Sequence, residues 1–418
     1  MFKTRQSIAD LAFWGIVSIN LLYLNGLFTS IFNIETFFSP LILICCIIVL
    51  FTTPKPKNYT KLLLVLLLFF LTYFYIGGII AILNPQNIHA KTSIYTLYRG
   101  YFSSILIYFS VYQYLINEYN KRGKERLINI LHNLIFFLLV PLFFTIFGKQ
   151  FGLSDAMTYV RDYGDRQTGI FTNPNTAGLQ ANYVLCFSLY SILARRRWRL
   201  FWILLVPISF YAVFLCLSKA GLLMAIINLV LFVIFNFVYF FRFELVSKLN
   251  AVLIITLFIA SGFIIYNNFE GLVSTMTPAQ ASRVVDAIRI SQGEINDQTT
   301  SERSGIAELV FPRIKEHLLF GNGIGSFHRI VDHGLGVHNS GLMIIGEAGI
   351  VPLMFFLGFV FLYIKCLLKL HNFAIKFLFL SIFSTFILVS FLTSHNALDE
   401  RISNVLLAIF IVLVNKVE

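Results

Sequence analysis

Residues 61–83 read KLLLVLLLFFLTYFYIGGIIAIL, a run in which only the first lysine is charged. About twenty apolar residues form a helix long enough to cross a bilayer core of about 30 Å. Similar stretches recur along almost the whole chain, which is 58% hydrophobic and 12% charged. A soluble domain is about one quarter charged. We therefore expect an all-α integral membrane protein, with residues 1–418 forming a single polytopic membrane domain.

The hydrophobic stretches predict about twelve transmembrane helices. They lie at about 8–28, 37–52, 61–83, 94–117, 127–147, 174–194, 199–217, 221–241, 249–267, 339–364, 377–393 and 402–415. No small-residue cleavage site follows the first stretch, so we expect it to be an uncleaved helix. The five cysteines lie inside these stretches or, for Cys366, two residues beyond one, which favours apolar packing over a disulfide framework or a metal site.

The loops differ in charge on the two sides of the predicted membrane. KPKNYTK (55–61), NKRGKER (120–126) and RRRWR (195–199) fall on one side, with both termini. Because cytoplasmic loops carry an excess of Lys and Arg, this side is predicted to be cytoplasmic. The opposite side carries one large loop, 268–338, with amphipathic helical patterns near 279–291 and 302–318. We attribute the net charge of +12 to orientation signals and to anionic lipid or substrate, and expect no nucleic-acid partner.

Several cations lie on the predicted outer side, where the charge bias disfavours them. Arg99 is one of them, and Lys219, in CLSKAGLL (216–223), is expected to lie at the membrane edge because the turn that carries it is so short. Lys219 is either an anion contact or a lysine that marks a helix end by extending its charge to water. Arg303 follows the helix-start pattern TTS (299–301) and is a weak signal alone, since an exposed helical arginine is usually solvated.

The segment GDRQTGIFTNPNTAGLQAN (164–182) places Arg166 just before a predicted helix start. Asn173 is expected to be the N-cap, with Pro174 at the first helical position. The N–H groups at such a start can bind an anion, although an ordinary capped helix explains the same pattern. Asn175 adds a polar group inside the predicted span, where polar groups are unfavourable.

The stretch GVHNSGLMIIGEAGI (336–350) places His338 at the outer end of a predicted span, before a cap at Asn339 or Ser340. A neutral imidazole can accept a proton from a sugar hydroxyl, and a structural role is the alternative. Glu347 lies about two and a half turns deeper. Because an isolated carboxylate is unfavourable there, we expect it to pair with a cation or polar group from another helix and to position its surroundings.

Other chemistries have little support in the sequence. D-x-D, P-loop, H-E-x-x-H and G-x-S-x-G patterns are absent. The run GNGIG (321–325) is similar to a phosphate-binding glycine loop, but it lacks the strand–turn–helix context and is a weak signal.

With these motifs in place, the chain resembles the bacterial O-antigen polymerase and O-antigen ligase superfamily. The resemblance is carried by TSERSGIAEL, LLFGNGIGSFH and HNSGLMIIGEAGIVPLMFF within 299–358, by RQTGIFTNPNTAGLQANYVL and by LSKAG. It covers about 160–360 in motifs and the whole chain in topology. Two departures are Lys219 where members commonly have arginine, which loses the bidentate fork, and Pro352 where glycine is common.

The resemblance implies an inner-membrane glycosyltransferase of the GT-C type, active on its periplasmic side, without a metal ion or other cofactor. Its donor would be a glycan on undecaprenyl pyrophosphate. In that reaction His338 would be the base and Arg303 a catalytic cation, while Lys219, Arg166 and Arg99 would bind the pyrophosphate. The residues in supporting positions would be Asn339, Glu347, Asn173 and Asn175.

The resemblance leaves two reactions open. A polymerase in lipopolysaccharide biosynthesis joins lipid-linked chains, whereas a ligase transfers the finished glycan to the lipid A core. The residue composition, rich in Phe, Ile, Asn, Lys and Tyr, is typical of AT-rich genes such as those of surface-polysaccharide clusters. Polymerases are encoded in such clusters, so the composition favours a polymerase. Membrane lipids and a chain-length regulator are further candidate partners. Outside enzymes, the main alternative is a transporter or flippase of lipid-linked oligosaccharides, although transporters tend to place charge near the membrane midplane.

Overall fold

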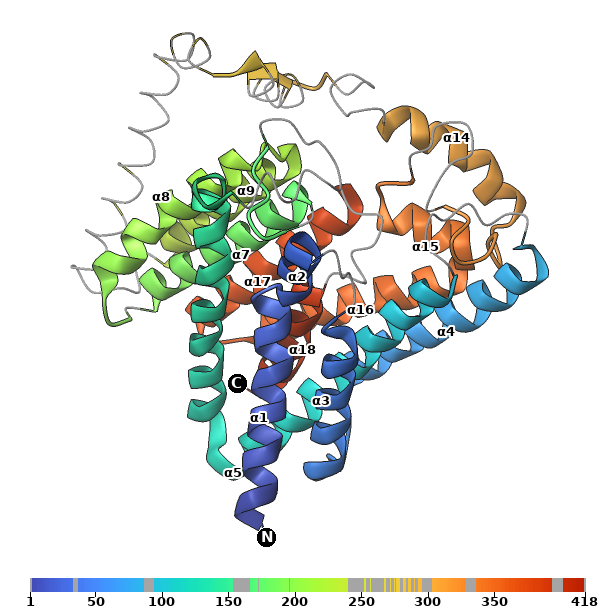
Figure 1. Cartoon of the computed structure of the whole chain (residues 1–418), viewed down its shortest axis with the longest axis horizontal. Helices are drawn as coiled ribbons and strands as arrows, with labels where there is room; N and C mark the ends of the chain where they lie inside the picture. The colour runs from blue at the N-terminus through green and yellow to red at the C-terminus, as the bar shows by residue number, and fades with distance from the viewer. Residues whose placement is uncertain are drawn as a thin grey trace.

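The computed structural model describes residues 2–32, 37–85, 94–152, 166–171, 173–194, 196–239, 303–327, 336–392 and 401–416, with scattered residues between 252 and 294. Every regular element in these residues is helical (Figure 1). The expected span at 249–267 and the expected helical pattern at 279–291 lie almost wholly outside the described residues.

Helices occur along the whole described part of the chain. They are α1 (Phe2–Leu21), α2 (Leu24–Phe32), α3 (Ser39–Thr52), α4 (Lys61–Leu83), α5 (Ile94–Phe147), the short 3-10 helix η2 (Gly148–Phe151), α7 (Pro174–Leu193), α8 (Arg199–Leu215), α9 (Lys219–Tyr239), α14 (Arg303–Glu316), α15 (Ser340–Ala348), α16 (Ile350–Lys369), α17 (Phe373–Leu392) and α18 (Arg401–Lys416). The prediction of an all-α protein is confirmed for this part of the chain.

Two expected spans are each divided into two helices. The stretch 8–28 is interrupted because Tyr23 has a φ of 54°, which ends α1 and lets α2 start in a new direction. The stretch 339–364 is interrupted at Gly349, which has a φ of 82°. A Cβ at that glycine would lie 2.1 Å from the Leu319 carbonyl oxygen, so only glycine fits the break between α15 and α16.

The expected spans 94–117 and 127–147 are two arms of α5. The arms meet at Gly123, whose φ of 74° and ψ of −170° are not helical. Glycine adopts such a conformation at little cost, so the basic segment between the arms changes direction without a long loop. α4 has the bounds that its hydropathy predicts, and α14 corresponds to the pattern at 302–318.

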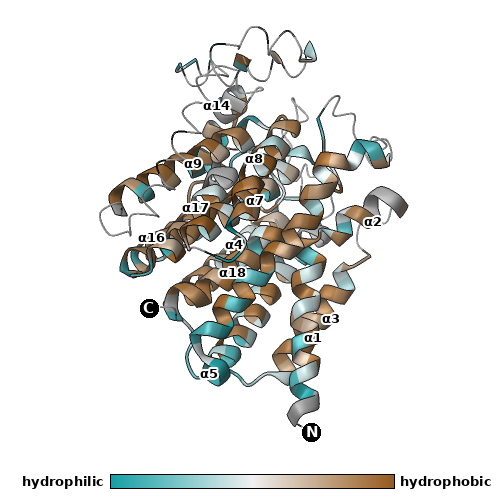
Figure 2. Ribbon diagram, turned by 90° about the vertical axis from the view of Figure 1, so that its left-hand side faces the viewer, coloured by the Kyte–Doolittle hydropathy of each residue, from teal (hydrophilic) through white to brown (hydrophobic). Residues whose placement is uncertain are grey.

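Four of the described helical segments are long and apolar enough to cross a membrane: Lys61–Leu83, Tyr98–Phe151, Lys219–Val238 and Ile350–Lys369. Exposed apolar side chains recur along α4 at every third or fourth position: Leu64, Leu68, Leu71, Tyr75, Ile79 and Ile82. Such a stripe keeps one side of a helix apolar and uncovered, as contact with lipid requires. Figure 2 shows the same apolar character over most of the helices.

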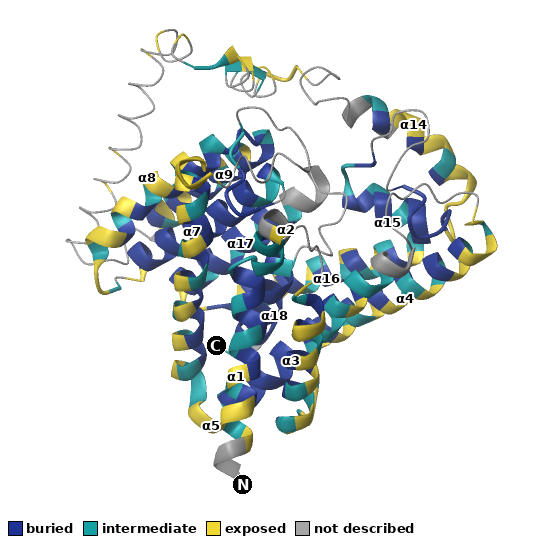
Figure 3. Cartoon of the chain, viewed as in Figure 1, coloured by how far each residue is buried: buried dark blue, intermediate teal, exposed yellow. Residues whose placement is uncertain are grey.

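The core of the protein surrounds α18 and α7. Residues 402–414 of α18 are all buried, and Figure 3 shows α18 almost wholly in the colour of buried residues. α18 packs mainly on α5, while α7 packs on α8, α17, α5 and α9. A helix that is apolar and covered on all sides is a central one, so α18 lies in the interior of the fold.

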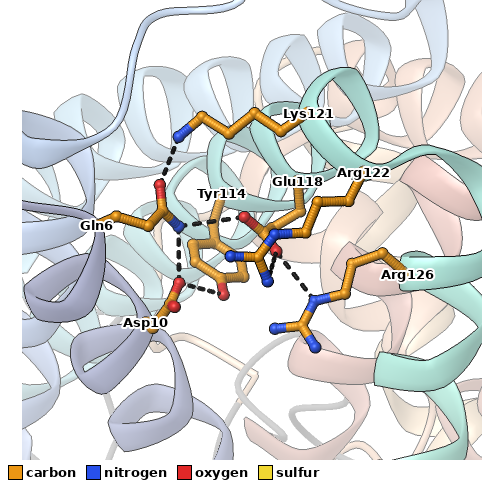
Figure 4. Close-up of polar contacts among 7 residues, drawn as sticks. All are labelled: Gln6, Asp10, Tyr114, Glu118, Lys121, Arg122 and Arg126. Carbon is orange, nitrogen blue, oxygen red and sulfur yellow. Dashed lines mark hydrogen bonds and ion pairs between the residues drawn. The ribbon is translucent and has the colours of Figure 1, made fainter. Parts of the chain in front are cut away.

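A polar network joins α1 to α5 near the Gly123 bend (Figure 4). The fully buried Glu118 carboxylate accepts hydrogen bonds from Gln6 (3.1 Å) and Arg126 (3.0 Å). Asp10 accepts from Gln6 (2.7 Å) and Tyr114 (2.8 Å). In Figure 1 the N-terminus and the α5 bend lie at one end of the molecule, while α9, α14 and α15 lie toward the other. The network therefore fixes the end remote from those helices.

Candidate functional site

The start of α15 carries two of the predicted site residues. Asn339 is the N-cap, with its side-chain oxygen accepting a hydrogen bond from the Leu342 N–H at 3.0 Å. This confirms one of the two caps expected from the sequence. His338 precedes the cap and is half-buried. The imidazole therefore belongs to the segment that leads into α15 and lies outside the helix itself.

Glu347 is fully buried near the end of α15, and its carboxylate accepts several hydrogen bonds. One oxygen accepts from the backbone N–H groups of Gly325 (2.9 Å) and Phe327 (3.3 Å). The other accepts from the hydroxyl of Tyr73 in α4. The polar partner that Glu347 was expected to find on another helix is thus Tyr73. These contacts replace the water that a buried carboxylate loses.

The glycine run 321–325 packs tightly against α4 and α15. A Cβ on Gly323 would lie 2.7 Å from the Ala81 Cα, and Gly323 has a φ of 98°. The backbone N–H of Asn322 donates to Gly346 O (2.7 Å), and that of Gly323 donates to Glu347 O (2.9 Å). These N–H groups are therefore engaged within the protein, so the run is a packing element in place of a phosphate-binding loop.

This packing reaches the residue next to His338. The Phe327 N–H donates to Glu347, and the Phe327 carbonyl accepts from the Val337 N–H at 3.0 Å. Val337 and Phe327 also share an apolar cluster with the Ile306 side chain of α14. Through Phe327, Glu347 is connected to the backbone next to His338, and Tyr73 binds the same carboxylate. This arrangement is compatible with the positioning role expected of Glu347.

Arg303 is the first residue of α14, and its side chain lies outside what the structure describes. α14 itself is placed by Ile306, Val310 and Ile314, which are buried against Phe327 and Met343. The helix that begins at Arg303 therefore packs on the same cluster that supports the segment before His338.

Arg166 lies at the junction of α7, α8 and α9. Its Nη2 donates to the Asn175 side-chain oxygen at 2.9 Å, and its Nε donates to the Cys216 carbonyl at 3.1 Å. Asn173 caps α7 by accepting from the Asn175 N–H at 2.8 Å, as the Asn-Pro pattern predicts. The hydrogen bonds of Arg166 thus join the start of α7 to the turn that precedes Lys219.

Lys219 is the first residue of α9, and its ammonium makes an ion pair with Asp286 at 2.7 Å. The two side chains are 13% and 18% exposed, so this pair is partly shielded from solvent. Because Arg166 is bonded to the carbonyl three residues before Lys219, the fold brings these two predicted cations into one junction. A carboxylate already lies against one of them.

Arg99 is half-buried on α5, beside the helix that carries Tyr73. The Tyr101 ring lies 5.6 Å from the Tyr73 ring, and the Tyr98 hydroxyl donates to the Phe74 carbonyl at 3.4 Å. The start of α5 therefore lies next to the hydrogen bonds of Glu347. The predicted residues thus form two groups, one around α15 and the start of α5, and one at the start of α7 and α9.

Tyr73, Asp286 and Cys216 belong to these groups and were not predicted from the sequence. Tyr73 lies in the middle of an apolar run, where a tyrosine gives no sign of its partner. Asp286 lies in the long loop, 67 residues along the chain from Lys219 and in no recognisable motif. Cys216 contributes only a backbone carbonyl, which no side-chain pattern reveals.

No family model, curated protein or solved structure matches this chain. The resemblance drawn from its motifs therefore stays a prediction. Within the described part of the chain, no three His, Cys, Asp or Glu side chains gather to hold a metal ion. The expected metal-independent chemistry also stays a prediction.

Proposed function

We propose that this protein is a membrane glycosyltransferase that moves a glycan from undecaprenyl pyrophosphate to an acceptor sugar hydroxyl on the periplasmic side, as an O-antigen polymerase. The observation that supports this most is the junction of Arg166 and Lys219, at the start of α7 and α9. Two cations held at helix starts in an apolar protein match the needs of a lipid-linked diphosphate.

The proposed reaction is a displacement at the anomeric carbon. The acceptor oxygen forms a bond to that carbon while the bond to the diphosphate oxygen breaks, and the diphosphate leaves with the electron pair. His338 takes the proton from the acceptor hydroxyl. Arg166, Lys219, Arg99 and Arg303 stabilise the negative charge that develops on the diphosphate. By analogy with the resembled family, the displacement inverts the anomeric centre.

The Asp286–Lys219 ion pair makes a prediction about anion binding. Asp286→Asn should raise the affinity of the purified protein for inorganic pyrophosphate about fivefold, because the carboxylate no longer competes for the ammonium. Isothermal titration of the full chain in detergent measures this. Glu294→Gln is the matched control, since it removes a carboxylate from an exposed ion pair 3.8 Å long in the same loop. Unchanged or weaker binding by Asp286→Asn would exclude Lys219 as a pyrophosphate ligand.

A clean deletion strain tests the proposed function directly. The lipopolysaccharide ladder is compared on gels, and the undecaprenyl-linked glycans are analysed from the same cells. Core carrying a single repeat supports a polymerase. Bare core with long glycan retained on undecaprenyl pyrophosphate shows a ligase, and an unchanged ladder with unchanged lipid-linked glycans refutes both.

A further inference from the structure

Arg401 begins α18, the central helix of the fold. It is a charged residue on the predicted outer side that has no role in the site described above. Its side chain is partly buried, while the thirteen positions that follow it, 402–414, are all buried. A guanidinium at the start of a fully covered helix is unusual and calls for a partner.

α18 and α5 run in the same direction. The Asn404 side-chain nitrogen donates to the Ser104 hydroxyl at 2.8 Å, near the start of both helices. Toward the other end, the Lys416 ammonium lies 5.3 Å from the centre of the Tyr119 ring. From the first contact to the second, the residue numbers increase along both helices, so the start of α18 lies beside the early turns of α5.

This register brings Arg401 near the level of Arg99. Arg99 precedes Ser104 by five residues, and Arg401 precedes Asn404 by three. Asn404 also accepts from the Tyr108 hydroxyl at 3.1 Å, so its level on α5 lies between Ser104 and Tyr108. At about 1.5 Å per residue, the levels of Arg401 and Arg99 along the parallel helices therefore differ by about 3–9 Å. The fold thus places a second arginine within about two turns of a predicted pyrophosphate ligand.

The start of α18 also contacts α7. The Tyr183 hydroxyl of α7 lies 2.8 Å from the Ser403 hydroxyl of α18. α7 is the helix whose start carries Asn175 and its hydrogen bond to Arg166. The helix that Arg401 begins therefore packs on the one that bears Arg99 and makes a hydroxyl contact with the one that is joined to Arg166.

Within the described part of the chain, the guanidinium of Arg401 donates to one side chain, and one of its nitrogens is buried without a partner. Its Nη2 donates to the Ser39 hydroxyl at 3.1 Å. Its Nη1 is buried and has no hydrogen-bond acceptor, and no carboxylate among the described residues forms an ion pair with Arg401. A buried cationic donor without an acceptor is unfavourable unless an anion binds there.

We propose that Arg401 and Arg99 together form an anion site that binds a phosphate group of the diphosphate substrate. This inference rests on the proposed function for the identity of the lipid, but the anion site itself does not require the transfer reaction. Ser39 holds one edge of the guanidinium, which leaves Nη1 to donate to a phosphate oxygen.

Pyrophosphate binding by the purified full chain in detergent tests the site. Arg401→Gln should weaken the binding of inorganic pyrophosphate and of geranyl pyrophosphate at least about tenfold, because a charge-assisted contact is lost. Lys57→Gln is the control, since it removes one exposed charge from the loop before α4. Equal affinity in Arg401→Gln and wild type would overturn the proposal.

A second measurement avoids substitution, in case Arg401→Gln fails to fold. Wild-type protein is modified with an arginine reagent and analysed by mass spectrometry, with and without pyrophosphate. Protection of Arg401 and Arg99, but not of Arg122 near the Gly123 bend, is expected. Modification of Arg401 that is unaffected by saturating pyrophosphate would refute the site. If inorganic pyrophosphate and geranyl pyrophosphate both protect Arg401 while the ladder of the deletion strain is unchanged, the anion site is supported and the transfer function is refuted.

Discussion

Replacing His338 with alanine is expected to abolish glycan transfer while leaving the protein folded. The imidazole precedes the Asn339 cap and lies outside α15, so its loss removes the proposed base and leaves the cap of the helix in place. General-base catalysis typically contributes 10²–10⁴-fold, so transfer should fall by about a hundredfold or more. Complementation of the deletion strain, with membrane expression measured in parallel, gives the result.

Two comparisons separate a base from a structural histidine. His371→Ala removes an exposed histidine between α16 and α17 and should leave transfer unchanged. Added imidazole should restore part of the activity of His338→Ala membranes in vitro, because a small base can enter the space of the missing side chain. Full activity of His338→Ala would refute the assignment, whereas lost expression would show a structural role.

The positions of the helices are largely predictable from hydropathy, and their interruptions are not. α4 has the predicted bounds because both of its ends coincide with the ends of an apolar run. The break at Gly349 lies inside an apolar run and is imposed by the Leu319 carbonyl packed against it. The break at Tyr23 likewise depends on a left-handed residue that no glycine marks. Such breaks cannot be predicted from the local sequence, because they depend on how the chain packs in three dimensions.

In the candidate site, the local features were predictable and the long-range partners were not. Asn173 and Asn339 cap helices as their sequence patterns indicate, because capping involves residues two or three positions apart. The partners of Glu347 are backbone N–H groups of a glycine run and a hydroxyl of α4. The sequence of that run is similar to a phosphate-binding loop. The structure gives another reason for its glycines, which is close packing of Gly323 against Ala81.

The largest expected effect on stability is that of Glu347→Leu. The change removes the acceptor of three buried donors, namely the N–H groups of Gly325 and Phe327 and the Tyr73 hydroxyl. A buried donor left without a partner costs about 1–3 kcal/mol, so we expect the three to lower the free energy of unfolding by about 3–9 kcal/mol. Thermal or denaturant unfolding in detergent measures it.

Two matched variants separate this hydrogen-bond role from simple packing. Tyr73→Phe removes only one of the three donors and should cost about 1–2 kcal/mol, because the carboxylate keeps both backbone N–H groups. Glu347→Gln keeps the shape and one acceptor oxygen, so its loss should be smaller than that of leucine. Since Phe327 also binds Val337, beside His338, transfer should decline in the same order as stability. A Glu347→Leu protein as stable as wild type would show that the carboxylate does not hold the glycine run in place.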